Sequence, residues 1–131
     1  MAAGENHVWT ESYAASADLS TKQFFLVKRH TVEGQCAIVA AAADIPIGIL
    51  QNKPAAAGRA AEVVIAGRSK AQVEATTDIA IGDRLGPDAN GRLIKRTTDK
   101  DVVCAIAEQA ATAATGEIIE VTVFPAYNLS V

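Results

Sequence analysis

The sequence contains no long apolar run, few aromatic residues and no excess of basic charge. Because a membrane-spanning helix needs about 18 or more consecutive apolar residues, no span is predicted. The 12 Lys and Arg residues stand against 15 Asp and Glu, which leaves a net charge of -3. Nucleic-acid binding relies on a cationic surface that displaces counterions, so a nucleic-acid partner is excluded. Residues 1–10 lack the basic start and apolar stretch of a signal peptide, and we expect synthesis in a cytoplasm-like reducing compartment.

Cysteine and histidine are too scarce for a structural metal site. The two cysteines, Cys36 and Cys104, lie far apart without a CxxC spacing, and the two histidines are His7 and His30. A structural zinc site needs about four ligands at short spacings. Both cysteines stand in apolar strings, where Cys behaves as a small hydrophobe. We therefore predict two buried free thiols, no metal and no cofactor, with a disulfide only if the fold brings the two cysteines together.

Recognisable catalytic motifs are also missing. The chain has no GxSxG sequence and no His beside Ser or Cys in a nucleophile context. Residues 67–70 do not satisfy the phosphate-loop pattern and are predicted to form a turn between strands, whereas Asn90-Gly91 favours a tight hairpin rather than a calcium loop. Glu62 and Glu120 are expected on solvent-facing strand positions rather than as a glycosidase pair. The sequence thus predicts a protein that is not an enzyme.

The composition and the short apolar runs predict a mainly β fold. Half of the 131 residues are hydrophobic, and 27 Ala, 12 Val and 11 Ile indicate a core of small and β-branched side chains. Short β-type runs separated by Gly, Pro and Asn favour a small antiparallel β-barrel or sandwich. Ala is a strong helix former, so residues 105–114 leave room for at most one short helix.

An internal repeat suggests that the β-domain consists of two similar β-units. Residues 49–65 align without gaps on residues 107–123, at an offset of 58, and Gly58 aligns with Gly116. Upstream, residues 34–37 align loosely on residues 82–85, so we expect repeats at about 34–67 and 82–124 with an extra hairpin in the second copy. Chance similarity in an Ala-rich chain is the alternative. Together these features give a β-domain over residues 21–124.

Loosely ordered segments are predicted at both ends of this domain. Residues 1–20 show no sustained period and are expected to form an extended arm that is mobile in the free protein, and residues 125–131 a C-terminal tail. The arm carries Trp9 and Tyr13, which are the candidate anchors for docking onto a partner. The alternative is that both aromatic side chains pack on their own domain.

Several linked motifs between residues 17 and 124 resemble the small capsid decoration, or cement, proteins of tailed bacteriophages. The motifs are Ala17-Asp18-Leu19-Ser20-Thr21-Lys22-Gln23-Phe24-Phe25-Leu26-Val27-Lys28, Ile47-Gly48-Ile49-Leu50-Gln51-Asn52-Lys53-Pro54, Ala61-Glu62-Val63-Val64-Ile65-Ala66-Gly67, Ile81-Gly82-Asp83-Arg84-Leu85 and Asn90-Gly91-Arg92. The string from Ile47 to Pro54 is the most specific of them.

The resemblance implies a compact β-fold that binds the outside of the assembled head, oligomerises, commonly as a trimer, and has no enzymatic activity. It implies the major capsid protein and further copies of the chain as partners, bridging of capsomers, and a place on the outer capsid surface of the virion after synthesis in the host bacterial cytoplasm. The resemblance identifies no contact residues. Trp9 and Tyr13 are candidate capsid contacts because they are the aromatic residues of the predicted arm. The alternative functions are a β-barrel carbohydrate- or ligand-binding module and, less favoured, a small hydrolase.

Overall fold

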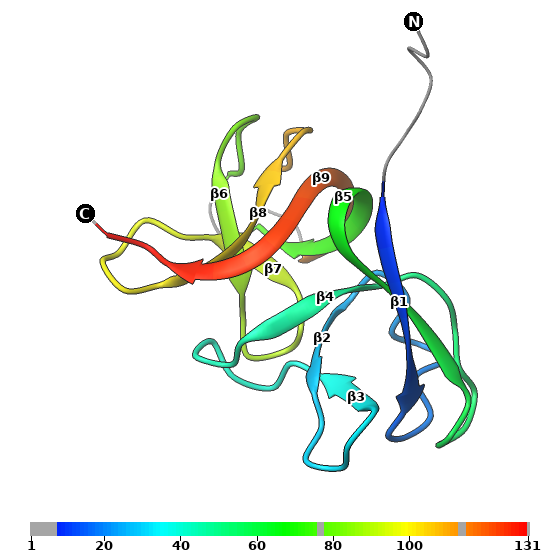
Figure 1. The fold of residues 1–131 in the computed structure, drawn as a ribbon. Coiled ribbons are helices and arrows are strands. Elements are labelled where there is room, and N and C mark those ends of the chain that lie inside the picture. The colour runs from blue at the N-terminus through cyan, green and yellow to red at the C-terminus, as the bar shows by residue number, and fades with distance from the viewer. Residues whose placement is uncertain (1–7, 76–77, 113–114, 131) are drawn as a thin grey trace, which may run out of the picture.

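Nine β-strands make up the fold in the computed structural model, which describes residues 8–75, 78–112 and 115–130 (Figure 1). No helix occurs in these residues, so the mainly β prediction is confirmed, and the short helix considered for residues 105–114 is not present in their described part, where residues 105–107 end a strand. The strands are β1 (Trp9–Ala15), β2 (Leu26–Arg29), β3 (Gln35–Ile38), β4 (Pro46–Leu50), β5 (Ala60–Glu74), β6 (Arg84–Pro87), β7 (Leu93–Lys95), β8 (Val102–Ala107) and β9 (Thr115–Asn128).

The strands pair into two closed rings that share the long strand β5. In the first ring, β1 pairs with β3 and with the first half of β5, and β2 and β4 complete the circuit. In the second ring, the later half of β5 pairs with β7 and β9, and β6 and β8 complete the circuit. Figure 1 shows β5 passing from one ring to the other. Closure matters because it leaves few unpaired strand edges.

The register of the pairs shows that the two rings are copies of one unit. Glu11 faces Val63 in the first ring, and Ser69 faces Val121 at the same place in the second ring, each residue being 58 positions later. The one parallel contact of each ring is also repeated, since β1 pairs with β3 as the later half of β5 pairs with β7. The prediction of two similar β-units is therefore confirmed.

The side chains that fill the two rings correspond in the same way. Val27, Cys36 and Val63 belong to the smaller core cluster, and their counterparts in the second ring belong to the larger one. The clearest pairs are Val27 with Leu85, Cys36 with Leu93 and Val63 with Val121. Apolar side chains therefore alternate inward along equivalent strands, as expected for a β-unit with one buried face.

A backbone feature at the entry to each unit supports the equivalence. Phe24 has φ = 69° and donates its N–H to the Leu50 carbonyl at 2.7 Å, whereas Gly82 has φ = 90° and donates to the Ala107 carbonyl at 2.8 Å. A positive φ is uncommon for a residue with a side chain. Phe24 and its counterpart Gly82 thus share a positive φ, although only glycine adopts this conformation without steric strain.

The repeat begins earlier than the sequence indicated. Its offset is 58 between β5 and β9 but 57 between β4 and β8, because Ile49 faces Val64 as Ile106 faces Thr122. Strand order equates β2 with β6 and β3 with β7, so residues 34–37 do not correspond to residues 82–85, and no extra hairpin enters the second copy. That short upstream match was similarity of composition rather than of position. Gly58 and Gly116 do occupy similar backbone conformations, with φ = 86° and 80°.

Three segments predicted to be loops lie in strands. Residues 9–15 of the expected arm form β1, and residues 125–128 of the expected tail belong to β9. Residues 67–70, expected to form a turn, lie inside β5 and pair with β9. These segments form strands because backbone hydrogen bonds to a neighbouring strand outweigh the weak local preference. Residues 1–7 of the arm lie outside the described residues.

Cys36 and Cys104 are both free and buried, as predicted, and they belong to different core clusters. Burial raises the pKa of both thiols, that of Cys104 to about 12. Since the thiolate is the reactive form, the native protein should not react with a disulfide reagent such as Ellman's reagent at about pH 8, near the ordinary thiol pKa. The same reagent should label both cysteines in guanidinium chloride, and rapid labelling of the native protein would contradict this burial.

Candidate docking groove

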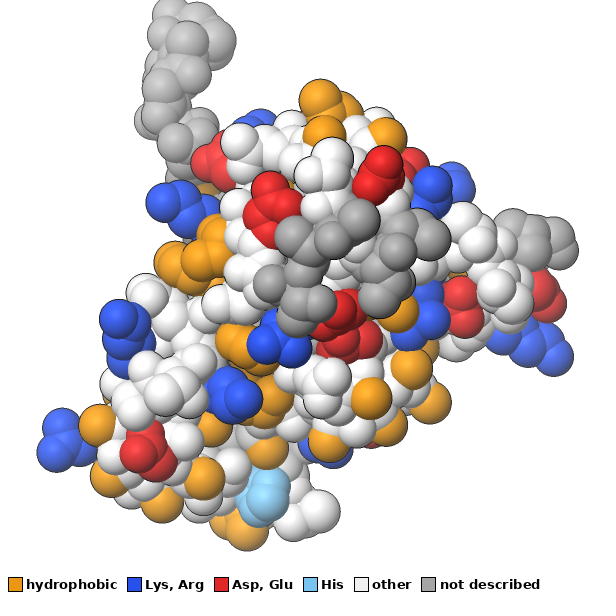
Figure 2. All heavy atoms as spheres, turned by 180° about the vertical axis from the view of Figure 1, so that it is seen from behind, with side chains coloured by type: hydrophobic (Ala, Val, Ile, Leu, Met, Phe, Trp, Pro, Cys, Tyr) orange, Lys and Arg blue, Asp and Glu red, His pale blue; other side chains and the backbone are white. Residues whose placement is uncertain are grey.

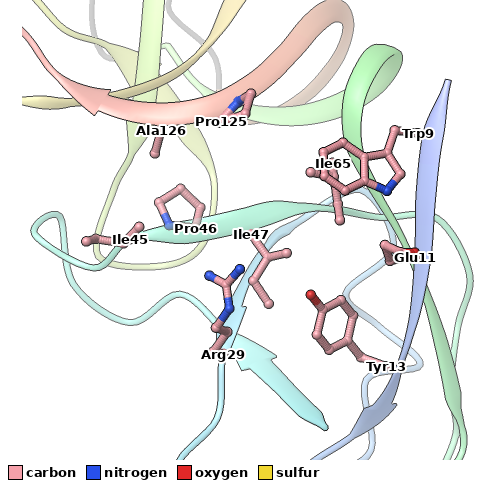
Figure 3. A pocket seen from close by; sticks show the side chains of 10 residues that line it. All are labelled: Trp9, Glu11, Tyr13, Arg29, Ile45, Pro46, Ile47, Ile65, Pro125 and Ala126. Carbon is pink, nitrogen blue, oxygen red and sulfur yellow. The ribbon is translucent and has the colours of Figure 1, made fainter. Parts of the chain in front are cut away.

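An open groove of about 340 Å³ lies beside the first ring (Figure 3). Its walls come from five strands and the loop before β4, and apolar side chains predominate in it. The lining residues are Trp9, Glu11, Tyr13, Arg29, Ile45, Pro46, Ile47, Ile65, Pro125 and Ala126. Residues far apart in the sequence therefore form one surface, which only the closed first ring and the path of β9 bring together.

Strand periodicity explains why β1 contributes three side chains to the groove. Successive side chains of a strand point to opposite faces, so Trp9, Glu11 and Tyr13 lie on the same face. Trp9 is 54% exposed, whereas Tyr13 is half-buried and packs against the smaller core cluster. Both predicted anchors thus line one groove, and Tyr13 also packs on its own domain. Contact of either side chain with a capsid stays a prediction.

A carboxylate fixes the loop that forms the far rim of the groove. Asp44 accepts hydrogen bonds from the backbone N–H groups of Ala40 and Ala41 at 3.0 and 3.1 Å, and from Lys28 Nζ at 2.9 Å. The bond from Ala40 and the contact with Lys28 lower the pKa of Asp44. This anchored loop presents the next residue, Ile45, which is 65% exposed.

The groove also carries two charged side chains of opposite sign. Arg29 enters from β2 and Glu11 from β1, and Figure 3 shows the polar ends of Arg29 and Tyr13 directed into the groove from its two sides. Arg, Trp and Tyr are the residue types that most often dominate binding energy at protein interfaces. The sequence indicated the two aromatic residues, but Arg29 carried no signal beyond a polar position at the end of a β-type run.

The other residues considered for chemistry have structural roles. The Asp88 side chain accepts hydrogen bonds from the backbone N–H groups of Asn90 and Arg92 at 2.8 and 2.9 Å, which stabilises the β6–β7 turn. Glu120 forms an ion pair with Arg68 at 2.6 Å on the surface. Among residues 8–75, 78–112 and 115–130, no group of three or more His, Cys, Asp or Glu side chains could hold a metal ion. The same residues include no helix that could span a membrane.

Comparisons with known proteins agree with this architecture. A family model described as phage cement protein matches residues 3–123. The fold is similar to a solved structure, the head fiber gp8.5 N base in bacteriophage phi29, with a TM-score of 0.61 and 18% identity. That similarity covers 89% of this chain and 94% of the other, and at this identity it concerns the fold alone. No curated protein matches the chain.

Proposed function

The chain belongs to the phage cement protein family, and from this premise we propose that it decorates the outer surface of the mature phage head and stabilises the shell by bridging neighbouring capsomers. The family is structural, and a capsid-associated role follows from membership. The proposed partners are the major capsid protein and further copies of the chain, in a homotrimer. The proposed location is the outside of the virion.

The observation that supports bridging is the spread of exposed apolar side chains over both rings of the chain. Val32 and Ile45 are 50% and 65% exposed in the first ring, and Ile81 and Ile118 are 70% and 46% exposed in the second unit. Figure 2 shows apolar side chains at several separate places on one face, with charges of both signs between them. A protein that joins neighbouring subunits needs such separate contact points.

Many weak copies can stabilise a shell without a tight individual site. Each contact that one subunit makes raises the effective concentration of the next, so linked contacts bind more tightly than each one alone. An oligomer multiplies this effect because its subunits are held at fixed spacing. A decoration protein therefore needs repeated contacts more than a deep pocket, and the two fused rings supply the repetition.

The test is co-sedimentation with isolated heads. We expect the protein to saturate expanded capsids and to bind unexpanded procapsids poorly, because the resemblance implies a binding site that forms on maturation. Occupancy is measured against protein concentration for both particles, and the thermal release of the packaged contents reports stabilisation of the shell. Equal occupancy of both particles, or no binding to either, would count against the proposal.

A further inference from the structure

The two rings differ at one end, although they are copies of one unit. The groove residues Glu11, Tyr13 and Ile65 of the first ring correspond to Ser69, Ala71 and Val123 of the second. The second-ring residues are buried, with exposed fractions of 8%, 1% and 2%. In the first ring the same end is the open groove, where Glu11 is exposed and Tyr13 half-buried, whereas Ile65 is buried like its counterpart Val123.

The second ring is covered at this end by the outer face of the first ring. Leu26, Ile49 and Val64 point away from the interior of the first ring, and they share one core cluster with Ala71, Cys104 and Val123 of the second. A hydrogen bond of 2.8 Å from Gln51 Nε2 to Ser69 Oγ joins the two units at the same place. The fold itself therefore demonstrates what fits on such an end, namely the outer face of another unit.

We infer that the groove of the first ring binds a second copy of this chain, through the outer face of the second ring of that copy. This inference rests on the proposed homo-oligomer and identifies its interface. The contact that joins the two units within one chain is then continued between chains. Such a head-to-tail contact is heterologous, so it closes into a ring when the rotation between copies allows it.

The side chains on the outer face of the second ring fit the groove chemically. The positions of Leu26 and Ile49 correspond to Arg84 and Ile106, and Arg96 lies at the position of Val39. A hollow of about 300 Å³ on this face is lined by Arg84, Lys95, Arg96 and Leu129, among others. The exposed Trp9 ring is a side chain that such a hollow can receive, because guanidinium groups stack on aromatic faces.

Both surfaces carry charges of both signs. The groove contains the carboxylate of Glu11 and the guanidinium group of Arg29, and the opposing hollow contains Arg84, Lys95 and Arg96 together with the carboxylate of Asp83, so each surface offers the other a partner of opposite charge. In the first ring the positions of Arg84 and Arg96 are occupied by the apolar residues Leu26 and Val39, which make a permanent contact within the chain. Arginine at the same positions of the second ring keeps that face soluble before assembly and leaves it able to bind a groove.

The test uses one variant on each surface of the full chain. We expect Trp9→Ala and Arg84→Glu each to weaken self-association roughly tenfold or more, as measured by sedimentation velocity over a range of concentrations. Arg59→Glu is the matched control for the charge reversal, because Arg59 is also exposed but lies outside both surfaces. Circular dichroism checks that all three variants are folded.

Mixing the variants distinguishes a head-to-tail contact from a symmetric one. Arg84→Glu retains an intact groove and Trp9→Ala an intact outer face. At a concentration at which each variant alone is monomeric, an equimolar mixture should therefore form a heterodimer. Variants that keep the wild-type mass but lose capsid binding would show that the capsid occupies the groove, which overturns this inference and leaves the proposed function standing. A third outcome is that the two monomeric variants associate when mixed, while the unchanged protein binds no capsid. That result would support the inference and refute the proposed function.

Discussion

Deleting residues 1–16 is expected to unfold the protein. The deletion removes β1, whose residues pair with β5 at six positions and with β3 at two. With roughly one hydrogen bond per pair and about 1 kcal/mol each, the loss is comparable with the whole stability of a typical domain, about 5–15 kcal/mol. It also uncovers Ala61 and Val63, which are fully buried in the native first ring.

Circular dichroism and thermal denaturation measure the outcome. The matched control is a shorter deletion that ends at His7, which keeps all nine strands and should retain a cooperative transition. The longer deletion should lose that transition or precipitate. If it instead kept the native spectrum and melted within a few degrees of the full chain, β1 would be a dispensable arm, as the sequence by itself suggested.

Replacing Gly48 by Ala is expected to cause a large loss of stability. A Cβ atom at this position would lie 2.0 Å from the carbonyl oxygen of Val64 and 3.0 Å from Cγ1 of Val63. Both neighbours belong to β5, which is held against β4 by the pairing of Ile49 with Val64. Since backbone atoms cannot move aside without separating the strands, we expect a cost of about 3 kcal/mol or more.

Gly58→Ala is the control for this substitution. Gly58 has φ = 86° and no atom within 4 Å of an added Cβ, so the cost is limited to backbone strain of about 1–2 kcal/mol. For a chain of this size each kcal/mol lowers Tm by about 3–5 °C. Gly48→Ala should therefore melt clearly below Gly58→Ala, and equal melting temperatures would show that β4 and β5 can separate at little cost.

The sequence by itself determined the β class, the buried thiols and part of the repeat. Short runs of Val and Ile between turn residues predict strands because β-branched side chains suit a half-buried pleated surface. The alignment of residues 49–65 with 107–123 was detectable because both segments contain a turn glycine and, four residues later, the pair Glu-Val at the start of a strand with one buried face. In those segments side-chain identity carries the structural constraint.

Only the tertiary structure decided that residues 9–15 begin the repeat and that β5 serves both rings. Residues 9–15 and 67–73 occupy equivalent places, yet they share no identical residue. Ring closure depends on backbone hydrogen bonds, which every residue except proline can make, so it leaves no signature in the side chains. The open groove also depends on the tertiary structure alone, because it lies at the end of the first ring that no neighbouring unit covers.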